Sequence, residues 1–483
     1  MKKTFDKLCR ALPERVGWEK GLRPFLFKKL PSRTGWAVTL GSVSVLVFAT
    51  MFVSGVFLAM YYNPSPDKAY NAIDYIMNEV PAGAILRGIH HWGASAMVIV
   101  VFLHLLTNFF SGTYKKPREL TWISGVVMFL IVLGLGFTGY LLPWDLKAYW
   151  ATTVSTNIPK DIPVVGKFLS HLALGGDNIS GATLTRFYAI HAMLLPALLV
   201  ALIAFHIYLV RAHGIAIEDE ELEGEESAST TMKPYRFFPE HLWRSSIVFV
   251  GVFLILLGLS RFAHVPREPV AGTPTESYLP RPEWYYMWLF QLLTFFHGKW
   301  EAVGSLLIPL IGVTLLFALP FLGRRNARLG VRNRPLPLAI GITVIVGIVY
   351  LTMMGFAGAR PYGQTINIPD RALSASEQRG LHLFADRECA YCHQINGQGG
   401  RRVGPDLVNE IAKHRTSEYL AQYIKNPQSI NSGSIMPKYD LSEADLKALA
   451  DFILALDFSK APQKTVSRAE ALGQDGKQSN AIE

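Results

Sequence analysis

Four histidines lie in apolar stretches of the sequence at nearly equal spacing. His90 and His104 are 14 residues apart, and His191 and His206 are 15 residues apart. At 1.5 Å per residue, each interval separates the two side chains by about 21 Å along a helix and leaves them on roughly one face. Two such helices packed together would offer two sites at different depths, each holding iron between two imidazoles as a b-type haem requires.

The alternative for a histidine in an apolar helix is a hydrogen-bonded core residue, and for one histidine alone the two interpretations are equally good. Two pairs with matched spacing favour the haem sites. In the doublet of the first pair, only His90 gives the 14-residue interval, so His91 is the weaker candidate.

A second motif with clear chemistry lies near the C-terminus. Cys389-Ala-Tyr-Cys392-His393 is a C-x-x-C-H sequence, in which two thiols bond the vinyl groups of a c-type haem and the adjacent histidine ligates its iron. A zinc site would need two more ligands at suitable spacing. A thioredoxin-like redox site would need a βαβ context, which the sequence lacks.

The elements that must position the histidines are apolar segments long enough to cross a bilayer, which takes about 20 residues. Half of the 483 residues are hydrophobic and 17% are charged, as in a membrane protein. The sequence predicts an all-α polytopic membrane protein whose seven transmembrane helices include a four-helix di-haem bundle, followed by a small soluble α-helical cytochrome c domain. The seven spans are expected at 36–62, 84–110, 120–142, 184–210, 243–264, 303–322 and 337–356.

Changes of composition divide the chain further. The segment 218–226 is nearly all acidic, and the last 25 or so residues are polar and expected to be disordered. The predicted parts are a basic N-terminal segment (1–35), a four-helix part (36–215), an acidic linker (216–241), a three-helix part (242–357), a linker (358–373), a cytochrome c domain (374–460) and a polar tail (461–483).

Charge placement predicts the orientation. The net charge of +10 does not indicate nucleic-acid binding, because the basic residues stand at the ends of apolar runs. One set of loops holds 21 Lys and Arg and the other set holds 7, so the first set, with the N-terminus, is expected to be cytoplasmic. Seven spans then place the C-terminal domain outside a bacterial inner membrane, where c-type haem is attached. Cys9 has no partner, and no removable signal peptide is expected.

Glycines repeat the histidine interval in the neighbouring spans. Gly41 and Gly55 are 14 residues apart in the first span, and so are Gly125 and Gly139 in the third. Because glycine allows close approach to the backbone, haem edges are expected to lie against these four residues. Ordinary small-residue packing between helices is the alternative. Arg87 and Arg186 stand just outside the outer histidines and are candidates to pair with haem propionates, or to anchor helix ends.

Four segments carry longer motifs: Arg87-Gly-Ile-His-His-Trp-Gly-Ala-Ser95, Lys116-Pro-Arg-Glu-Leu-Thr-Trp122, Gly139-Tyr-Leu-Leu-Pro-Trp-Asp145 and Leu184-Thr-Arg-Phe-Tyr-Ala-Ile-His191. Over about residues 30–357 the chain closely resembles cytochrome b. The 15-residue interval and the seven spans resemble the photosynthetic cytochrome bf branch, with its separate four-helix and three-helix chains joined here. That branch attaches an extra haem through a cysteine where this chain has Thr39, so the extra haem is expected to be absent.

Pro282, Glu283, Trp284 and Tyr285 follow a proline-rich loop, and the resemblance implies that they line a quinol-oxidation pocket. Glu283 would accept a proton from quinol at the membrane edge, and Tyr285 would hydrogen-bond the ring or its neighbours. An interfacial aromatic belt is the alternative. The segment 139–154, with Pro143, Trp144 and Tyr149, is expected to form the opposite wall. Arg211 and His213 are candidates for an inner quinone site near His206, or for simple positive-inside anchors.

Downstream of the C-x-x-C-H motif stand Gly404-Pro-Asp406 and Ile435-Met436-Pro437, a pattern that resembles a class I cytochrome c of about 80 residues. The resemblance implies that Met436 is the sixth ligand opposite His393, a pair that gives a relatively high potential. No other methionine occurs after Met354. An exposed loop methionine is the alternative.

The resemblance implies a quinol:cytochrome c-type oxidoreductase with two non-covalent b haems and one covalent c haem. One electron from quinol would go to a Rieske iron–sulfur subunit, which must be separate because this chain has no spare Cys/His set. The other would cross from the outer haem to the inner one, and protons would move outward. A homodimeric complex, with possible further c-type cytochromes, is expected. The alternatives are a non-bifurcating di-haem anchor for an external redox partner, and a transporter or channel with a tethered cytochrome.

Overall fold

The computed structural model describes residues 27, 29–30, 36–158, 165–176, 178–214, 235–271, 281–296, 300, 302–322, 331, 334–357, 365–399, 404–408, 415–431, 434, 436–459 and 461–473. Cys9, most of the expected basic segment 1–35 and most of the acidic linker 216–241 lie outside these residues. So do 358–364 of the expected second linker and 474–483 of the expected tail.

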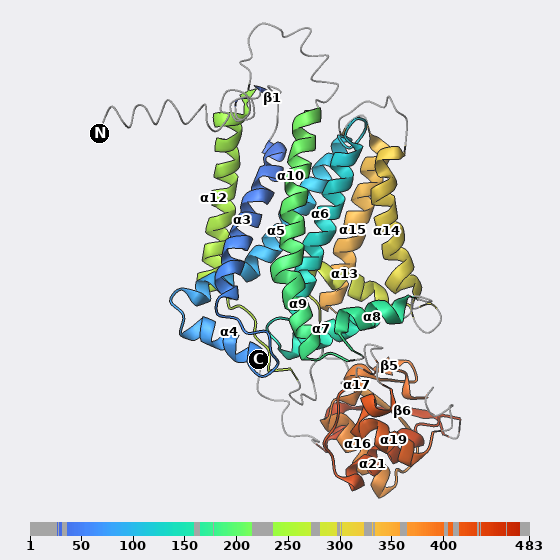
Figure 1. Ribbon diagram of the computed structural model, residues 1–483. Helices are drawn as coiled ribbons and strands as arrows, with labels where there is room; N and C mark the ends of the chain where they lie inside the picture. The colour runs from blue at the N-terminus through green and yellow to red at the C-terminus, as the bar shows by residue number, and fades with distance from the viewer. Residues whose placement is uncertain are drawn as a thin grey trace, which may run out of the picture. The chain divides into compact units, whose positions relative to one another are not determined.

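Seven helices of the described chain are long and apolar enough to cross a membrane, which confirms the predicted number and their order (Figure 1). Several are interrupted by short π or 3₁₀ turns without losing their direction. They are η2–α3 (Trp36–Val38, Thr39–Ala59), α5 (Gly83–Ser111), α6 (Glu119–Tyr140), α9–η4–α10 (Gly181–Ala189, Ile190–Leu194, Leu195–His213), η5–α12 (Phe237–His241, Leu242–Phe262), η7–α14–η8 (Val303–Leu307, Ile308–Ala318, Leu319–Phe321) and α15 (Pro335–Ala357).

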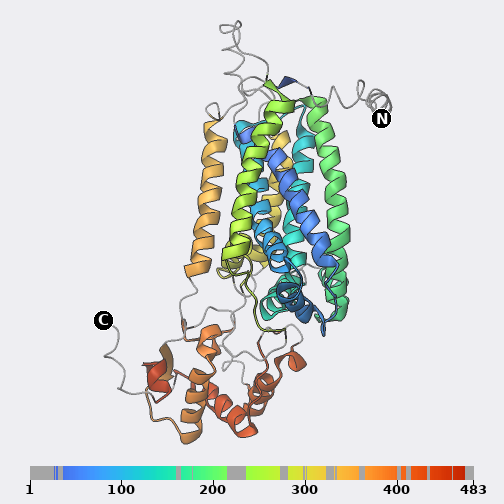
Figure 2. The same cartoon turned by 90° about the vertical axis from the view of Figure 1, so that its left-hand side faces the viewer.

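The chain divides into two compact units, the first comprising Met1–Pro143, Leu184–Arg267 and Leu310–Ile345. In this unit α3 packs against α5, α5 against α12, and α6 against α10, and Figures 1 and 2 show these helices running side by side. A short helix, α4 (Ala69–Asn78), packs against α5. The two-residue strands β1 (Lys29–Leu30) and β2 (Tyr235–Arg236) pair antiparallel.

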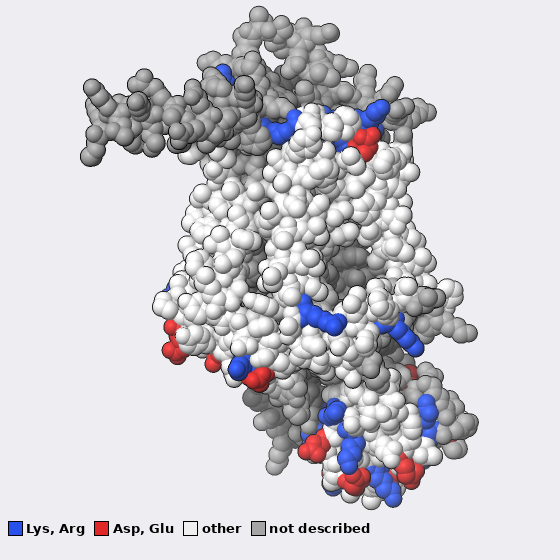
Figure 3. Space-filling view, viewed as in Figure 1, with Lys and Arg blue, Asp and Glu red and all other residues white. Residues whose placement is uncertain are grey.

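The helices of this unit are apolar on their outer surfaces as well as inside. Val43 and Val47 are fully buried, whereas Leu198 and Leu254 are 44% and 59% exposed. Such outward leucines indicate a surface that faces lipid, since water would make their exposure costly. In the face drawn in Figure 3, the charged side chains gather toward the helix ends and leave the middle of α3, α10 and α12 uncharged.

The second unit comprises Trp144–Thr183, Glu268–Pro309 and Val346–Glu483. Its first part contains α7 (Leu146–Asn157), α8 (Gly166–Leu174) and α13 (Trp284–Leu293). Asp145 caps α7 by accepting a hydrogen bond from the backbone nitrogen of Ala148, which satisfies one of the free N–H groups of the helix start.

The C-terminal part of this unit is a small helical fold around one core. Phe384 and Phe452 lie at its centre, with ring centroids 5.4 Å apart. Helices α16 and α21 cross at Gly380, where a Cβ atom would lie 2.1 Å from the carbonyl oxygen of Ala448, so only glycine fits. The elements are α16 (Ala375–Asp386), α17 (Cys389–Cys392), β4 (Gln394–Ile395), β5 (Gln398–Gly399), α19 (Ser417–Lys425), α20 (Pro427–Ile430) and α21 (Glu443–Ala455).

Two strands flank this domain, outside the bounds 374–460 expected from the sequence. Residues expected in the linker form strand β3 (Thr365–Pro369), which pairs antiparallel with β6 (Gln463–Ser467) in the expected tail, and α22 (Arg468–Ala471) follows. Asn367 is 1% exposed and accepts a hydrogen bond from the hydroxyl of Thr465. Arg468 pairs with Glu388 at 2.7 Å. The two strands thus satisfy each other's backbone groups, a long-range pairing that local composition does not reveal.

Candidate haem and quinol sites

The two outer histidines face each other in the first unit. His90 of α5 and His191 of η4 have ring centroids 6.2 Å apart and ring planes inclined by 76°. A metal–imidazole bond is about 2 Å long, so this separation leaves room for one metal atom between the two ring edges. His91 instead packs its ring on Trp92, 4.9 Å between centroids, in line with its weaker fit to the spacing.

The two inner histidines, His104 of α5 and His206 of α10, are close enough to interact electrostatically. They lie one 14- or 15-residue interval deeper along the same two helices as the outer pair. The first unit therefore brings all four predicted histidines together as two pairs at two levels.

Each of the four predicted glycines lies against one of the four histidine rings. A Cβ atom would lie 3.1 Å from Cε1 of His104 at Gly41, and equally far from Cε1 of His90 at Gly55. At Gly139 it would lie 2.5 Å from Cε1 of His191, and at Gly125 it would lie 3.5 Å from Cε1 of His206. The glycines thus make room for the imidazoles. Whether haem edges also lie against them stays a prediction.

Hydrogen bonds to Nδ1 orient three of the four rings. Ser54 Oγ lies 3.0 Å from Nδ1 of His90, and Ser124 Oγ lies 2.9 Å from Nδ1 of His206. Nδ1 of His191 lies 3.0 Å from the carbonyl oxygen of Leu135, and a donor–acceptor pair there needs the proton on Nδ1. Occupying Nδ1 leaves Nε2 as the nitrogen with a free lone pair, as metal-ligating histidines require. Nδ1 of His104 has no hydrogen-bond partner in the described part of the chain.

The unequal intervals have a local explanation. A straight α-helix would turn a fifteenth residue about 100° beyond the fourteenth, so a 15-residue pair should be out of register with a 14-residue pair. His191 lies in the π-helical turn η4, where the backbone nitrogen of Leu195 bonds to the carbonyl of Ile190. A π turn holds one extra residue, which restores the register. Pro196 favours it, because proline lacks an N–H and clashes with the carbonyl four residues earlier.

The other residues predicted around these sites lie as follows. Arg87 is buried and donates to the sulfur of Met77 and the carbonyl of Pro266, and Arg186 is exposed on α9. Neither position tests the predicted propionate contacts. Thr39 donates its hydroxyl to the carbonyl of Trp36 at 2.6 Å, at the start of α3.

An inner polar cluster joins three elements of the first unit. The guanidinium of Arg211 lies 4.2 Å from the ring centroid of Phe237. The ring of the buried His241 also stacks on Phe237, with 5.4 Å between the two centroids. Nε2 of His241 lies 3.1 Å from the hydroxyl of Ser42, next to Gly41 and so to the ring of His104.

Sequence reasoning predicted Arg211 in this cluster and missed Ser42 and His241. The only signal was a histidine at the start of the fifth span. His213, the other predicted residue, has a buried Nδ1 without a hydrogen-bond partner among the described residues, and its carbonyl accepts a hydrogen bond from Arg118.

The predicted quinol motif borders a cavity of about 320 Å³ in the second unit. Pro282, Glu283 and Trp284 line it, and Tyr285 is buried at the start of α13 with burial raising the pKa of its phenol above the ordinary value. The segment 139–154 was expected to form the opposite wall. Of this segment, Lys147 lines the cavity, whereas Trp144 and Tyr149 do not. The lining residues are Lys147, Glu268, Arg281, Pro282, Glu283, Trp284, Met287 and Phe356.

In the C-terminal domain, α17 holds the two cysteines one helical turn apart. Nδ1 of His393 lies 3.0 Å from the carbonyl of Pro405, which leaves Nε2 for a metal. A Cβ at Gly404 would lie 2.5 Å from Cε1 of His393, so glycine admits the ring. Cys389 and Met436 both pack against the domain core. The residues present therefore fit a haem attached at Cys389 and Cys392.

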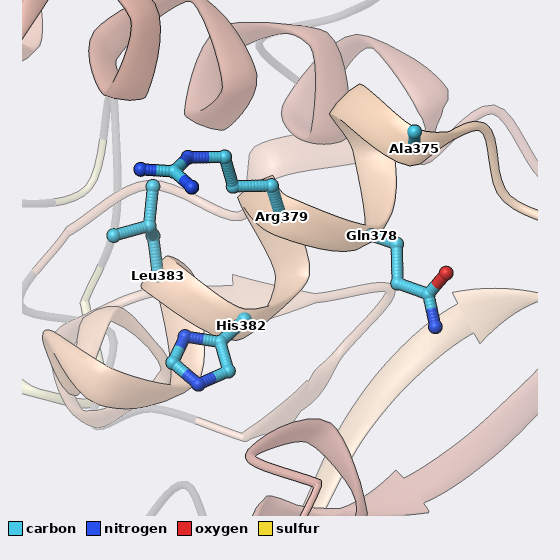
Figure 4. A pocket seen from close by; sticks show the side chains of 5 residues that line it. All are labelled: Ala375, Gln378, Arg379, His382 and Leu383. Atoms are coloured by element: carbon cyan, nitrogen blue, oxygen red, sulfur yellow. The ribbon is translucent and has the colours of Figure 1, made fainter.

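Burial raises the pKa of the Cys389 thiol to about 12, with the neighbouring Cys392 adding to the shift. A thiol that stays protonated at neutral pH does not suit the redox-motif alternative, which depends on a reactive thiolate. A separate hollow of about 540 Å³ lies on α16, lined by Ala375, Gln378, Arg379, His382 and Leu383. Figure 4 shows these side chains spread along one helix, so this hollow is not the cysteine site.

Comparison with known proteins matches family models to three parts of the chain. The family model described as Cytochrome b/b6/petB matches residues 27–214, and Cytochrome b(C-terminal)/b6/petD matches 273–368. A cytochrome bc complex cytochrome b subunit of Chlorobaculum thiosulfatiphilum is 33% identical over 321 residues, 66% of this chain and 73% of that protein. The chain belongs to the cytochrome b family.

Other cytochrome b relatives cover the N-terminal part. The menaquinol:cytochrome c reductase cytochrome b subunit of Bacillus subtilis (strain 168) is 50% identical over 177 residues, 36% of this chain and 79% of that protein. A solved structure titled "Hyperthermophilic respiratory Complex III" aligns with TM-score 0.63 and 26% identity, over 72% of this chain and 91% of that chain.

The family model Cytochrome c matches residues 377–457, so this cytochrome b carries a cytochrome c domain at its C-terminus. With its seven apolar helices it is an integral membrane protein. Cytochrome b and cytochrome c domains imply b- and c-type haem as its cofactors.

Proposed function

We propose that this chain is the quinol-oxidising subunit of a membrane quinol:cytochrome c-type oxidoreductase, with its own c-type cytochrome as an electron carrier. The observation that carries the proposal is the arrangement of two histidine pairs on α5 and α10, each ring against a glycine of α3 or α6. The name of the Bacillus subtilis relative favours menaquinol as the substrate.

His90 with His191, and His104 with His206, are the proposed axial ligands of two b haems, and Arg87 and Arg186 are the proposed propionate contacts. When bound, the haems supply one-electron transfer across the membrane between the two quinone sites. The protein orients three of the four imidazoles through Ser54, Ser124 or the carbonyl of Leu135, so that these rings do not reorient when the charge at the site changes.

Quinol oxidation is proposed to take place at the cavity beside Glu283. The carboxylate accepts a proton from the quinol hydroxyl, because a base must remove the protons that oxidation releases. Tyr285 remains a neutral phenol, since burial raises its pKa, and it can therefore donate a hydrogen bond at any physiological pH. Trp284 and Pro282 supply the apolar wall against which a quinone ring packs.

The inner cluster is the proposed site of quinone reduction. Arg211 supplies a fixed positive charge, and His241 with Ser42 supplies a hydrogen-bonded proton donor within one residue of Gly41. A quinone that gains electrons needs both, because its oxygens become negative before they are protonated. His213 stays a candidate for the rim of the same site.

In the cytochrome c domain, Cys389 and Cys392 are the proposed covalent attachment points, and His393 and Met436 the proposed axial ligands. The amide of Gln428 donates to the carbonyl of Met436 at 2.7 Å, which fixes the loop that presents the thioether. The likeness to a Complex III structure and to bc-complex subunits supports a Rieske iron–sulfur subunit as the electron acceptor at the quinol site and a homodimeric complex.

For orientation, we propose that the N-terminus is cytoplasmic and the cytochrome c domain lies on the outer side of a bacterial inner membrane, on the basis of the loop charges. Protons released near Glu283 would then leave on the outer side.

Two measurements on the purified complex test the proposal. A pyridine haemochrome assay should give two b haems for each c haem of this chain. Quinol addition should reduce the b and c haems together, and Glu283→Gln should slow both. A simple membrane anchor would instead reduce its b haems with quinol while the c haem stays oxidised, and that result would overturn the proposal.

A further inference from the structure

An ion pair joins two walls of the quinol cavity. Nζ of Lys147 lies 3.1 Å from Oε1 of Glu283, and their side chains are 23% and 21% exposed. Both line the same cavity of about 320 Å³. The proposed base of quinol oxidation therefore has a cationic partner from another segment of the chain.

The local backbone leaves Glu283 available for this contact. Glu283 is the N-cap residue of α13, with φ −61° and ψ 155°, but its side chain makes no capping hydrogen bond to that helix. The free N–H groups at a helix start attract a negative charge. Here the carboxylate extends to Lys147 instead.

Lys147, in contrast, projects from a backbone segment that is held by several hydrogen bonds. It is the second residue of α7, whose start is capped by the buried Asp145. The backbone nitrogen of Leu146 donates to Pro269 at 2.8 Å, and that of Ala271 donates to Trp144 at 3.0 Å. A side chain that projects from such a rigid element keeps its place while a mobile partner moves.

Other charged groups lie close by. Glu268 and Arg281 line the same cavity, one of each sign, and Asp145 accepts a hydrogen bond from the backbone of Glu268. The ion pair with Lys147 is the direct contact of the Glu283 carboxylate that the geometry identifies.

We propose that Lys147 is a positioning residue at which Glu283 releases the proton it has taken from quinol. This inference rests on the proposed function. Oxidation of one quinol yields one quinone, two electrons for the acceptors named above and two protons, of which the Glu283 carboxylate takes one. The resulting carboxylic acid is neutral, so no electrostatic attraction keeps the Glu283 side chain near the quinone. When it meets Lys147 it loses the proton to water, and the new carboxylate forms the ion pair.

The attraction to Lys147 makes proton release directional, because only the ionised side chain is held at this place. A static structural ion pair would have no such effect on catalysis.

The test compares Lys147→Met and Lys147→Arg in the complete complex, with quinol and an external electron acceptor. For Lys147→Met we expect kcat to fall about tenfold while KM for quinol stays within about twofold, because the cation acts after binding. Lys147→Arg, which keeps the charge, should restore kcat.

Lys167→Met is the matched control, since it removes an exposed cation of the neighbouring helix α8 and should leave kcat as in the wild type. Unchanged b-haem spectra would show that the variants fold. A Lys147→Met complex with the wild-type kcat, or a Lys147→Arg complex as impaired as Lys147→Met, would overturn the inference.

Glu283→Gln and the double variant separate this inference from the proposed function. If Lys147 acts through Glu283, the double variant should be no slower than Glu283→Gln alone. A wild-type complex that oxidises no quinol would refute the proposed function and the inference together. A slow Glu283→Gln complex beside a normal Lys147→Met complex would refute only the role of Lys147.

Discussion

The ring centroids of His90 and His191 lie 6.2 Å apart, and a glycine of a third or fourth helix, Gly55 of α3 or Gly139 of α6, lies against each ring. The separation is set by the surrounding chain: Ser54 and Leu135 fix the rings, and Gly55 and Gly139 admit them. How the chain constructs this pair can be tested.

Gly139→Ala should disrupt the outer b haem. The new methyl group would lie 2.5 Å from Cε1 of His191, and such overpacking costs about 1–3 kcal/mol. We expect loss of one b-haem signal, or a changed midpoint potential, in an optical redox titration. Gly125→Ala is the control, because its methyl group would make an ordinary 3.5 Å contact with His206. Equal behaviour of the two variants would contradict this account.

Two single-residue deletions test the π turn. Removing Met193, which is 70% exposed, together with Pro196→Ala should convert η4 into plain α-helix and keep His191 in register with His206. Ile99 is 44% exposed on α5, and the segment between His90 and His104 is α-helical throughout. Removing Ile99 should therefore rotate His104 by about 100° relative to His90. The b-haem content should stay at two in the first variant and fall to one in the second. Retention of both haems after the α5 deletion would argue against the register explanation.

Met436→Leu should lower the potential of the c haem without releasing it. Cys389 and Cys392 keep the group attached, while the loss of the thioether removes the ligand that raises the potential. Axial ligands set haem potentials over about 0.8 V, so a fall on the order of 100 mV is expected in a potentiometric titration of the c band. An unchanged potential would show that another group is the sixth ligand.

A substitution in the inner cluster should impair quinone reduction and leave quinol oxidation unchanged. His241→Phe removes one hydrogen bond from Ser42, worth about 1 kcal/mol or roughly fivefold in rate. Reoxidation of the reduced b haems by added quinone should slow by that factor, whereas quinol-driven reduction of the c haem should not. His241→Gln keeps a hydrogen-bonding group and should lie between. A defect confined to quinol oxidation would place the cluster elsewhere in the mechanism.

Acid should loosen the start of α16 in the cytochrome c domain. The Arg371 guanidinium, with both nitrogens 2.8 Å from the carboxylate oxygens, lowers the pKa of Glu377 from 4.5 to about 2. A lowered carboxyl pKa stabilises the fold above pH 4.5, and this contribution is lost as the pH falls toward 2. Because the pair is partly exposed, Glu377→Gln should cost only ~0.5 kcal/mol at neutral pH. The difference between variant and wild type, followed by the c-haem absorption during denaturation, should vanish near pH 2.

Much of this architecture follows from local sequence. The seven spans follow from hydropathy alone, and the histidine pairs and the C-x-x-C-H motif follow from spacing. The π turn was within reach of sequence reasoning, because a 15-residue interval followed by Pro196 needs one extra residue to match a 14-residue partner.

Other features depend on contacts between distant residues. Lys147 and Glu283 are 136 residues apart, and Ser42 and His241 are 199 apart. Nothing in either local segment indicates the partner, since a lysine at a helix start or a histidine at a span end has many ordinary uses. The spacing picked out the four glycines, but it did not show which side chains they contact. A sequence interval locates a small residue and gives no information about its neighbour on another helix.

The pairing of β3 with β6 bears on biosynthesis. Asn367 and Thr465 meet across 98 residues of chain, and the haem-attachment cysteines lie between them. A growing polypeptide presents its N-terminal residues first, so Cys389 and Cys392 emerge well before the strand that completes the domain. Covalent attachment of a cofactor at these cysteines can therefore begin while the two ends of the domain are still unjoined, and β6 then closes the fold around a group already in place.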